Sequence, residues 1–407
     1  MRRATLPALL LLVGFAAMAA LYAWGGGAYF ALREAAGLQA FVPFLDLHGV
    51  MAAIECWQDG VDVYSVNTCD HLGRVHVYSP LWLRLPGMFG APELTMPIGI
   101  GLALAFILSL LVVPAPTGAG GMVVLVLAVV SPDTVFALER ANMDVLIFAA
   151  VVLAVPMLAG GLVARGFAYA VFLAVGLLKF YPLVLLGLVV RERPVLTLLF
   201  GAAALGGLAA VALPLAGEFG RAIGNILPTP VFSGTFGARH LGLGLGLLLP
   251  GYAGVAVGVL VAAAAVMVAV RLARDTVVRG ALDALPRRDA DLLLVGAVLM
   301  LGCFLAGENV EYRAIFLLLT VPALWRMGGM FAATAGCVAW LMWDPVVRRV
   351  VARLVPGEGE IPGVPGLALW TVREVLWWWV AVVLAGLVVG LLRRAPGWAL
   401  IGVRPAQ

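Results

Sequence analysis

The 407-residue chain is 63% hydrophobic and only 12% charged, with a mean hydropathy of +1.08. Soluble domains carry about 25% charged residues, so this composition excludes a soluble globular protein and predicts an all-α polytopic membrane protein. The net charge of +4 then reflects membrane topology, and we expect a lipid bilayer and no nucleic acid among its partners.

Apolar runs of spanning length follow one another along the chain, separated by polar or glycine- and proline-containing breaks. They predict a bundle of roughly 12 transmembrane helices, because about 20 apolar residues cross a bilayer. The runs begin near positions 6, 97, 120, 144, 166, 183, 195, 253, 291, 313, 328 and 375. The first resembles a signal peptide but is long enough to span, so we interpret it as a retained helix. Residues 1–407 are expected to form a single membrane domain.

Basic residues outnumber acidic ones in the loops that fall on one side of this predicted bundle. These loops are 191–194, 271–291, 325–329 and the C-terminal tail. Basic loops stay in the cytoplasm, which places both termini there. An Ala-, Gly-, Val- and Arg-rich composition is typical of a GC-rich bacterial genome, so the expected location is a bacterial inner membrane. The longer polar segments, 25–96, 214–240 and 344–374, then face the periplasm or exterior, where we expect the functional site.

The first outer segment, 25–96, is predicted to contain interfacial helices and a candidate general base. Residues 51–57, MAAIECW, are typical of a helix lying along the membrane surface. Asp46 sits just before this helix, between the apolar stretches FVPFL and LHGVM, and a carboxylate placed there can serve as a general base. The other acids of this segment are interpreted as solvated loop residues: Asp59, Asp62 and Asp70.

Cysteine and histidine give no sign of a metal site. Cys56 and Cys69 share the first outer segment, and the sequence leaves open whether they form a disulfide or remain free thiols. Cys303 and Cys337 lie in apolar runs and are interpreted as packing residues. The histidines are scattered without metal-ligand spacing, so no metal and no other cofactor is expected. They are His48, His71, His76 and His240.

The stretch ALERANMDVLIF, residues 137–148, places four polar side chains at the mouth of an apolar run. Glu139 and Asn142 are three residues apart, which would put them on one face of a helix. We interpret Glu139 and Arg140 as structural support, and Asn142 and Asp144 as residues that contact a polar ligand.

Two cations on the same predicted side are candidates for binding an anion. Lys179 is the one lysine of the chain and interrupts an apolar run just before Pro182. It either snorkels to the interface or serves as a point charge for a phosphate. Arg313 lies at the head of another run, where arginine is a natural anion clamp. Arg239 and His240 lie on the same side.

Taken in order, five stretches resemble one family. They are LDLHGVMAAIECWQDGVDVY, VYSPLW, SPDTVFALERANMDVLIF, GLLKFYPLVLL and NVEYRAIFLLL. The chain resembles the C-type (GT-C) glycosyltransferases, specifically the polyprenol-phosphate-mannose-dependent group called glycosyltransferase family 87. The resemblance runs from about residue 45 to 322, most of the chain.

This resemblance implies a GT-C-like bundle and an active site at the extracytoplasmic membrane surface. Asp46 would deprotonate an acceptor hydroxyl, and Lys179 and Arg313 would bind the phosphate of a polyprenyl-phosphate-linked sugar, usually mannose. The sugar would pass, with inversion, to a glycolipid or glycan acceptor. The remaining pocket residues would be Tyr64, Tyr78, Asn142, Asp144, Arg239, His240, Glu311 and Tyr312.

Departures from the family pattern leave the donor sugar open. Tyr78-Ser79-Pro80 stands where many members have YPP, Asp62-Val63-Tyr64 stands where they have DPY, and Glu311-Tyr312 replaces a His-His pair. The alternative enzyme is a transferase of a lipid-linked pentose of the arabinose type. The rival class is a secondary transporter or lipid flippase, which would place ionisable groups near the bilayer midplane.

Overall fold

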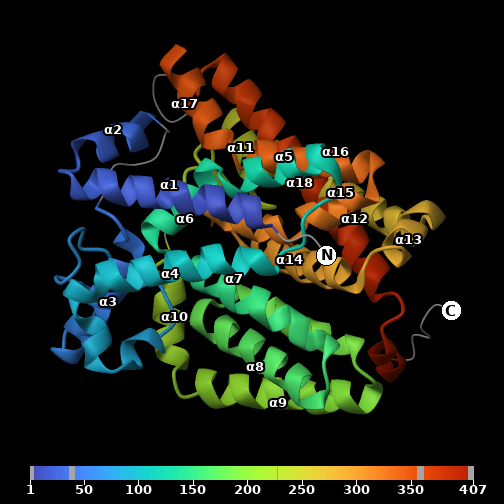
Figure 1. The fold of residues 1–407 in the computed structure, drawn as a ribbon, viewed down its shortest axis with the longest axis horizontal. Helices are drawn as coiled ribbons and strands as arrows, with labels where there is room; N and C mark the ends of the chain where they lie inside the picture. Colours follow the sequence, from blue (N-terminus) through green and yellow to red (C-terminus); the bar gives the residue numbers. More distant parts are fainter. Residues whose placement is uncertain (1–3, 36–41, 227, 355–361, 402–407) are drawn as a thin grey trace. The chain divides into compact units, whose positions relative to one another are not determined.

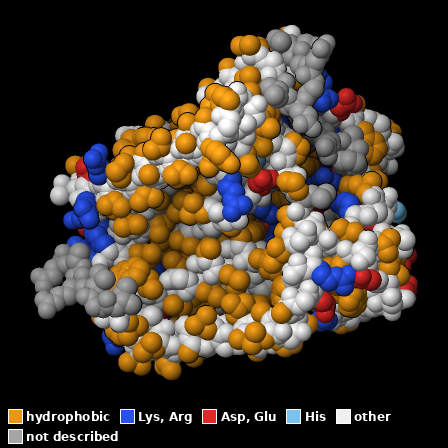
Figure 2. Space-filling model, turned by 180° about the vertical axis from the view of Figure 1, so that it is seen from behind, with side chains coloured by type: hydrophobic (Ala, Val, Ile, Leu, Met, Phe, Trp, Pro, Cys, Tyr) orange, Lys and Arg blue, Asp and Glu red, His pale blue; other side chains and the backbone are white. Residues whose placement is uncertain are grey.

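The computed structural model describes residues 4–35, 42–226, 228–354 and 362–401, and these are mostly helical (Figure 1). Within these ranges, eight helices are long and apolar enough to cross a membrane, or nine if the bent pair Gly329–Leu341 and Asp344–Leu354 is one span. The described chain is therefore a multi-pass, all-α membrane protein. Figure 2 shows hydrophobic side chains spread over the face that it presents.

The expected count of about twelve spans is not confirmed. Two of the expected segments are shorter apolar helices, Met143–Ala159 and Tyr181–Arg191. In each, a proline coincides with a change from α to 3₁₀ geometry, because its ring excludes the i→i−4 hydrogen bond. Pro156 lies in the 3₁₀ segment Val155–Ala159, and Pro182 lies near the start of Tyr181–Arg191.

The chain forms two compact units. The first comprises Met1–Ala40, Leu110–Phe136 and Thr229–Arg393. Its α-helices are α1 (Thr5–Ala23), α2 (Gly27–Ala35), α5 (Gly118–Val129), α11 (His240–Leu248), α12 (Ala253–Arg274), α13 (Thr276–Asp283), α14 (Arg287–Ala306), α15 (Val321–Met327), α16 (Gly329–Leu341), α17 (Asp344–Leu354) and α18 (Val364–Leu392). The 3₁₀ helices are η4 (Leu110–Val112) and η7 (Glu311–Leu319). A short antiparallel pair joins β1 (Thr235–Phe236) and β2 (Asn309–Val310).

The second unit comprises Phe41–Ser109, Ala137–Pro228 and Arg394–Gln407. Its α-helices are α3 (Leu45–Gln58), α4 (Thr95–Ser109), α7 (Met143–Ala154), α8 (Leu162–Lys179), α9 (Pro194–Ala212) and α10 (Ala216–Gly224). Its 3₁₀ helices are η1 (Trp82–Arg84), η2 (Gly87–Gly90), η3 (Pro92–Leu94), η5 (Val155–Ala159), η6 (Tyr181–Arg191) and η8 (Pro396–Ile401). The chain passes from the first unit to the second within α6 (Pro132–Arg140).

Helix α3 is the centre of the non-spanning part of the second unit. Its buried face packs into a cluster of Ala53, Cys56, Val63, Tyr64, Leu83 and Ala222. A disulfide joins Cys56 on this helix to Cys69 in the following loop, which settles the alternative that the sequence left open. The loop that follows α3 is thus fastened to the helix. Cys303 and Cys337 take no part in a disulfide, and Cys303 is buried.

Candidate functional site

Backbone conformations that are rare for side-chain-bearing residues occur beside the candidate residues of the second unit. In the part of the chain that the structure describes, three non-glycine residues have positive φ: Phe44 (61°), Ala141 (42°) and Phe180 (46°). Phe44 lies two residues before Asp46, Ala141 directly before Asn142, and Phe180 directly after Lys179. Such conformations cost free energy and cluster at functional sites. They single out this region before any side-chain contact is considered.

The left-handed conformation of Phe44 determines where α3 begins. Its backbone N–H donates to the Glu139 carbonyl (2.6 Å), and its ring occupies the space over Gly99 of α4, where a Cβ would lie 2.4 Å from ring carbons. The helix starts at the next residue, Leu45. The prediction that Asp46 precedes the helix is therefore wrong: Asp46 lies in the first turn of α3, where a helix favours a carboxylate.

Three donors converge on the Asp46 carboxylate. Asn142 Nδ2 donates to Oδ2 at 2.7 Å, while Arg74 Nη1 and Arg140 Nε lie 3.4 and 3.8 Å from Oδ1. The Asp46 side chain is 11% exposed. Two cations and an amide thus fix an almost buried carboxylate that still reaches the surface. Arg140, interpreted from the sequence as structural support, lies directly beside the candidate base.

Asn142 is held in one orientation by its place in the chain. α6 ends at Arg140 and α7 begins at Met143, with Asn142 as the N-cap whose Oδ1 accepts the Asp144 N–H at 3.1 Å. The prediction that Glu139 and Asn142 share a helix face is wrong, because the positive φ of Ala141 separates the two helices. With its oxygen capping α7, the Asn142 amide presents its NH₂ group to Asp46.

Lys179 belongs to the same network. Its Nζ lies 2.6 Å from Asn142 Oδ1 and 2.7 Å from Asp144 Oδ1, and Tyr181 also donates to Asp144 Oδ1 at 2.6 Å. The chain Asp46–Asn142–Lys179–Asp144–Tyr181 is therefore continuous. The Lys179 side chain is 8% exposed and that of Asp144 is fully buried, so the charge of Lys179 is balanced inside the protein. Its Nζ also lies 5.5 Å from the centroid of the Tyr78 ring.

Tyr64 has a packing role in this unit. It is 3% exposed, and its hydroxyl donates to Glu218 of α10, which also pairs with Arg84 at 2.5 Å. Burial, reinforced by the neighbouring Glu218 carboxylate, raises the pKa of Tyr64. The side chain links the loop after α3 to α10 and lies within the apolar cluster around Ala53.

The other predicted pocket residues belong to the first unit. Glu311 pairs with Arg348, Arg313 Nη1 donates to Asn309 Oδ1, and the Tyr312 ring meets Phe136 edge-on at 5.7 Å between centroids. Arg239 is the N-cap residue of α11. His240 is fully buried, and burial together with the Arg373 charge lowers its pKa to about 4. The contacts described above around Asp46 all lie within the second unit.

Sequence reasoning missed Arg74 and gave Tyr181 no role. Arg74 follows the positive-φ turn at Gly73 and lies 28 residues beyond Asp46, a separation that no local periodicity connects. Tyr181 follows Lys179 by two residues, and its place after the break at Phe180 was a usable signal.

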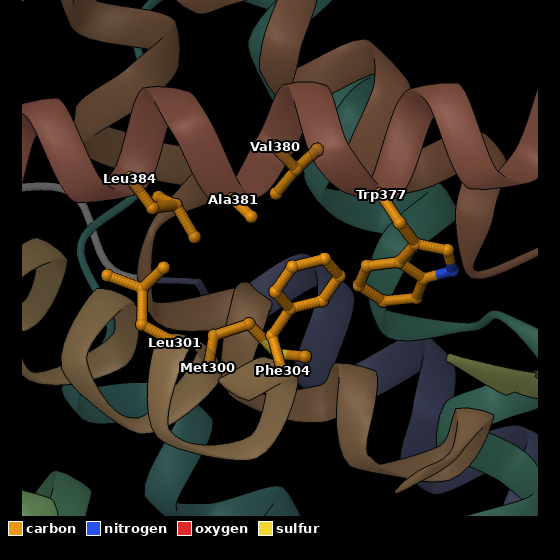
Figure 3. A pocket seen from close by; sticks show the side chains of 7 residues that line it. All are labelled: Met300, Leu301, Phe304, Trp377, Val380, Ala381 and Leu384. Atoms are coloured by element: carbon orange, nitrogen blue, oxygen red, sulfur yellow. The ribbon is translucent and has the colours of Figure 1, made fainter. Parts of the chain in front are cut away.

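Among the described residues, a cavity of about 320 Å³ in the first unit is lined in part by Asp344, Arg348 and Arg373. A second, much smaller pocket of about 10 Å³ lies between α14 and α18. Its lining is apolar, and the side chains from the two helices point toward one another (Figure 3): Met300, Leu301, Phe304, Trp377, Val380, Ala381 and Leu384. It holds at most one water and offers a ligand little polar recognition. No three His, Cys, Asp or Glu side chains lie together in metal-binding geometry within the described ranges.

The constellation consists of a nearly buried carboxylate, held by two arginines and an amide, at the start of a non-spanning helix. Such a group can accept a proton from a bound hydroxyl, with cations beside it for developing negative charge. Comparison of the chain with protein-family models, with curated proteins and with solved structures finds no match.

Proposed function

We propose that this chain is an inverting glycosyltransferase. It moves a sugar, with mannose as the first donor to test, from a polyprenyl-phosphate carrier to a glycolipid or glycan acceptor. The observation that carries the proposal is the Asp46 carboxylate, bound at 2.7 Å by Asn142 and flanked by Arg74 and Arg140 in a chain of apolar helices. The order of motifs resembling the GT-C glycosyltransferases supports it.

The proposed reaction is a single displacement. Asp46 takes the proton of an acceptor hydroxyl, whose oxygen forms a bond to the anomeric carbon of the donor sugar. The bond from that carbon to the phosphate oxygen breaks, and polyprenyl phosphate leaves with the electron pair. Configuration inverts because attack and departure occur on opposite faces.

Negative charge grows on the leaving phosphate and needs a cation nearby. We assign that role to Arg140, whose Nε lies 3.8 Å from Asp46 Oδ1 and whose side chain is 13% exposed. Lys179, already paired with Asp144, is assigned to holding Asn142. This division of roles revises the sequence-based pairing of Lys179 with Arg313.

The proposed setting is a bacterial inner membrane, with the Asp46 end of the second unit facing the periplasm. The carrier lipid lies in the same bilayer, so donor and acceptor meet at its surface. The distribution of arginine among the loops supports this orientation. A GT-C-like bundle that includes the shorter apolar helices is part of the same proposal.

The test is sugar transfer by the purified protein in nanodiscs. Radiolabelled polyprenyl-phosphate mannose and a membrane glycolipid extract are supplied, and product glycolipid is counted. Asp46→Asn should abolish transfer, since the amide cannot take a proton, while donor binding remains. The matched control is Asp59→Asn, an exposed acid just after the other end of α3, which should keep wild-type transfer.

The same experiment separates the alternatives. Transfer from a lipid-linked arabinose donor but not from mannose would identify a pentosyltransferase. Movement of labelled lipid across the bilayer without a new glycosidic bond would identify a flippase. Full transfer by Asp46→Asn would remove Asp46 as the base, and the lack of product with both donors would refute the proposal.

A further inference from the structure

We propose that Arg74, clamped by Asp70, is the positioning residue that fixes the Asp46 carboxylate for proton transfer. The inference deepens the proposed function and rests on it. Arg74 acts through Asp46, whose carboxylate it holds in place. Three features support the proposal. Asp70 binds the Arg74 guanidinium, the guanidinium contacts the first turn of α3, and Gly49 of α3 leaves the space in which the guanidinium lies.

Asp70 holds Arg74 with its whole carboxylate. Its Oδ2 accepts the Arg74 backbone N–H and Nε, both at 2.9 Å, and its Oδ1 accepts Nη2 at 2.8 Å. The Leu72 N–H adds a bond of 3.3 Å. Asp70 is 4% exposed. Burial alone would raise its pKa, but the hydrogen bonds from Arg74 outweigh that effect and hold the pKa below its ordinary value. A two-point carboxylate–guanidinium pair of this kind fixes direction as well as distance.

The opposite edge of the guanidinium contacts the first turn of α3. Nη2 donates to the Leu45 carbonyl at 2.8 Å, and Nη1 lies 3.4 Å from Asp46 Oδ1. One planar group therefore contacts both the backbone before Asp46 and the carboxylate itself. A lysine could supply the charge but not these directed bonds, since an ammonium is a point charge without a fork.

Gly49 supplies the space in which the guanidinium lies. It is a helical residue one turn after Asp46, and glycine inside a helix costs about 0.5–1 kcal/mol relative to alanine. A Cβ at this position would lie 2.6 Å from Arg74 Nη2, 3.2 Å from Cζ and 3.4 Å from Asp70 Oδ1. The clash falls on the far end of a flexible side chain. Gly49→Ala should therefore displace the guanidinium while the helix still folds.

The Cys56–Cys69 disulfide also holds the Asp70–Arg74 turn against α3. Cys56 lies in α3 and Cys69 directly precedes Asp70, so the covalent bond fastens the Asp70–Arg74 turn to the helix that carries Asp46. The base, its positioning residue and the clamp are thus connected through one short, closed segment of chain.

The decisive variant is Gly49→Ala, compared with Gly101→Ala. Gly101 lies in α4 of the same unit, and a Cβ there would meet no atom within 4 Å. We expect Gly49→Ala to lower kcat about tenfold or more with KM nearly unchanged, because misplacing a reacting group by about 1 Å is enough for such losses. Arg74→Lys should show the same split, since it keeps the charge. Gly101→Ala should match wild type, and a purely structural role for Arg74 would reduce the folded fraction without changing kcat per folded molecule.

A second readout is independent of sugar transfer. The Asp46 carboxylate is modified with a carbodiimide and an amine, and the modification rate is measured by peptide mass spectrometry. In Gly49→Ala the Asp46 carboxylate is no longer held by Arg74, so it should react several-fold faster than in wild type or in Gly101→Ala. If wild type transfers no sugar but this rate rises, the proposed function fails and the positioning geometry stands. If the rate is unchanged, or kcat is unchanged in an active enzyme, Arg74 does not position Asp46.

Discussion

Lys179 and Asp144 form an ion pair where two apolar helices meet loop structure, almost closed off from solvent. Transferring a charged side chain from water to the protein interior costs several kcal/mol for each ion. The attraction between the two ions offsets this cost only when their geometry is good and further hydrogen bonds are made. Here the geometry includes Asn142 and Tyr181 as additional partners of the pair. We therefore interpret the pair as the anchor of the amide that faces Asp46.

This interpretation predicts a strong asymmetry between single and double substitutions. Lys179→Met leaves the Asp144 charge buried beside one fewer cation and should lower the free energy of unfolding by about 3–5 kcal/mol. The double variant Lys179→Met/Asp144→Leu removes both charges, so its free energy of unfolding should fall clearly less than that of Lys179→Met alone. Denaturant unfolding in detergent micelles measures both. If the double variant is as unstable as the sum of the single ones, the two charges are not coupled.

His76 gives the second unit a pH dependence of its own. The side chain is 3% exposed, and its Nε2 lies 3.3 Å from the Ser79 carbonyl. Burial lowers its pKa from 6.5 to about 4. The unfolded state therefore takes up a proton first as the pH falls. Stability is complete above about pH 6.5 and declines by about 1.4 kcal/mol per pH unit down to about pH 4.

The unfolding temperature between pH 4 and pH 7 checks this expectation. His76→Gln should make the decline over that window shallower, while His48 and His240, whose pKa values burial also lowers, still contribute to it. In the same loop the pKa values of Asp62 and Asp70 lie below their ordinary value of 3.8, so their contributions are lost only at still lower pH. A wild-type profile that is already flat from pH 7 to pH 4 would contradict the burial of a neutral His76.

The residue types of the site were visible in the sequence, but their contacts were not. Polar residues beside apolar runs singled out Asp46, Asn142, Asp144 and Lys179, and the second unit brings all four into one network. The partner of Asp46 from the disulfide loop, Arg74, could not be predicted, because its contact depends on the fold of a loop without periodicity. One sequence feature is related to this contact: Gly49, the glycine inside α3, leaves the space that the Arg74 guanidinium occupies.

At the scale of elements, the stretch HLGLGLGLL has a simple explanation in the packing of α11 on α12. Gly242 of α11 faces Gly254 and Gly258 of α12, and a Cβ at Gly254 would lie 2.2 Å from the Gly246 nitrogen. Small residues on both sides let two helices approach closely, as is common between membrane helices. α11 and α12 belong to the same unit and are in contact.

Gly254→Leu should therefore separate the two helices. Overpacking of this kind costs about 1–3 kcal/mol, which should appear as a lower free energy of unfolding. Gly246→Ala is the matched control, since a Cβ there would meet no atom within 4 Å. Equal stability of Gly254→Leu and the control would show that α11 and α12 are not packed this closely.

The disulfide should contribute to stability through the short loop that it closes. Cys56 and Cys69 are 13 residues apart, and closing a loop of that size is worth about 3 kcal/mol. The double variant Cys56→Ala/Cys69→Ala should lose about that much, and a reducing agent should destabilise wild type but not the variant. If reduction leaves the unfolding of wild type unchanged, the bridge does not form in the protein.

The positions of most helices followed from hydropathy, while their lengths did not. Expected starts near 6, 195 and 253 correspond to helices that begin at Thr5, Pro194 and Ala253. Where a proline falls inside an apolar run, the α-helix stops early, and a window of hydropathy cannot register this. The β1–β2 pair was also missed, because two-residue strands carry no alternation to detect.

At the scale of the whole molecule, hydropathy shows which segments are polar, and the balance of basic and acidic residues in the loops indicates which side of the membrane each segment faces. Basic residues outnumber acidic ones in the loops that the hydropathy pattern places together, with 271–291 the longest of these loops. The segment with Asp46 and the disulfide falls on the opposite side in this pattern. An exported, oxidising compartment is also where disulfides persist.

The orientation can be tested with two matched substitutions in a Cys337→Ser background. Val66→Cys replaces a 51% exposed side chain in the disulfide loop, and Val277→Cys replaces a 78% exposed one in α13. Because Cys303 is buried, a bulky maleimide that cannot cross membranes should report only the introduced thiol. In intact spheroplasts we expect Val66→Cys to be labelled and Val277→Cys to be labelled only after the membrane is opened. The reverse pattern would place Asp46 on the cytoplasmic side, and the proposed periplasmic transferase would have to be abandoned.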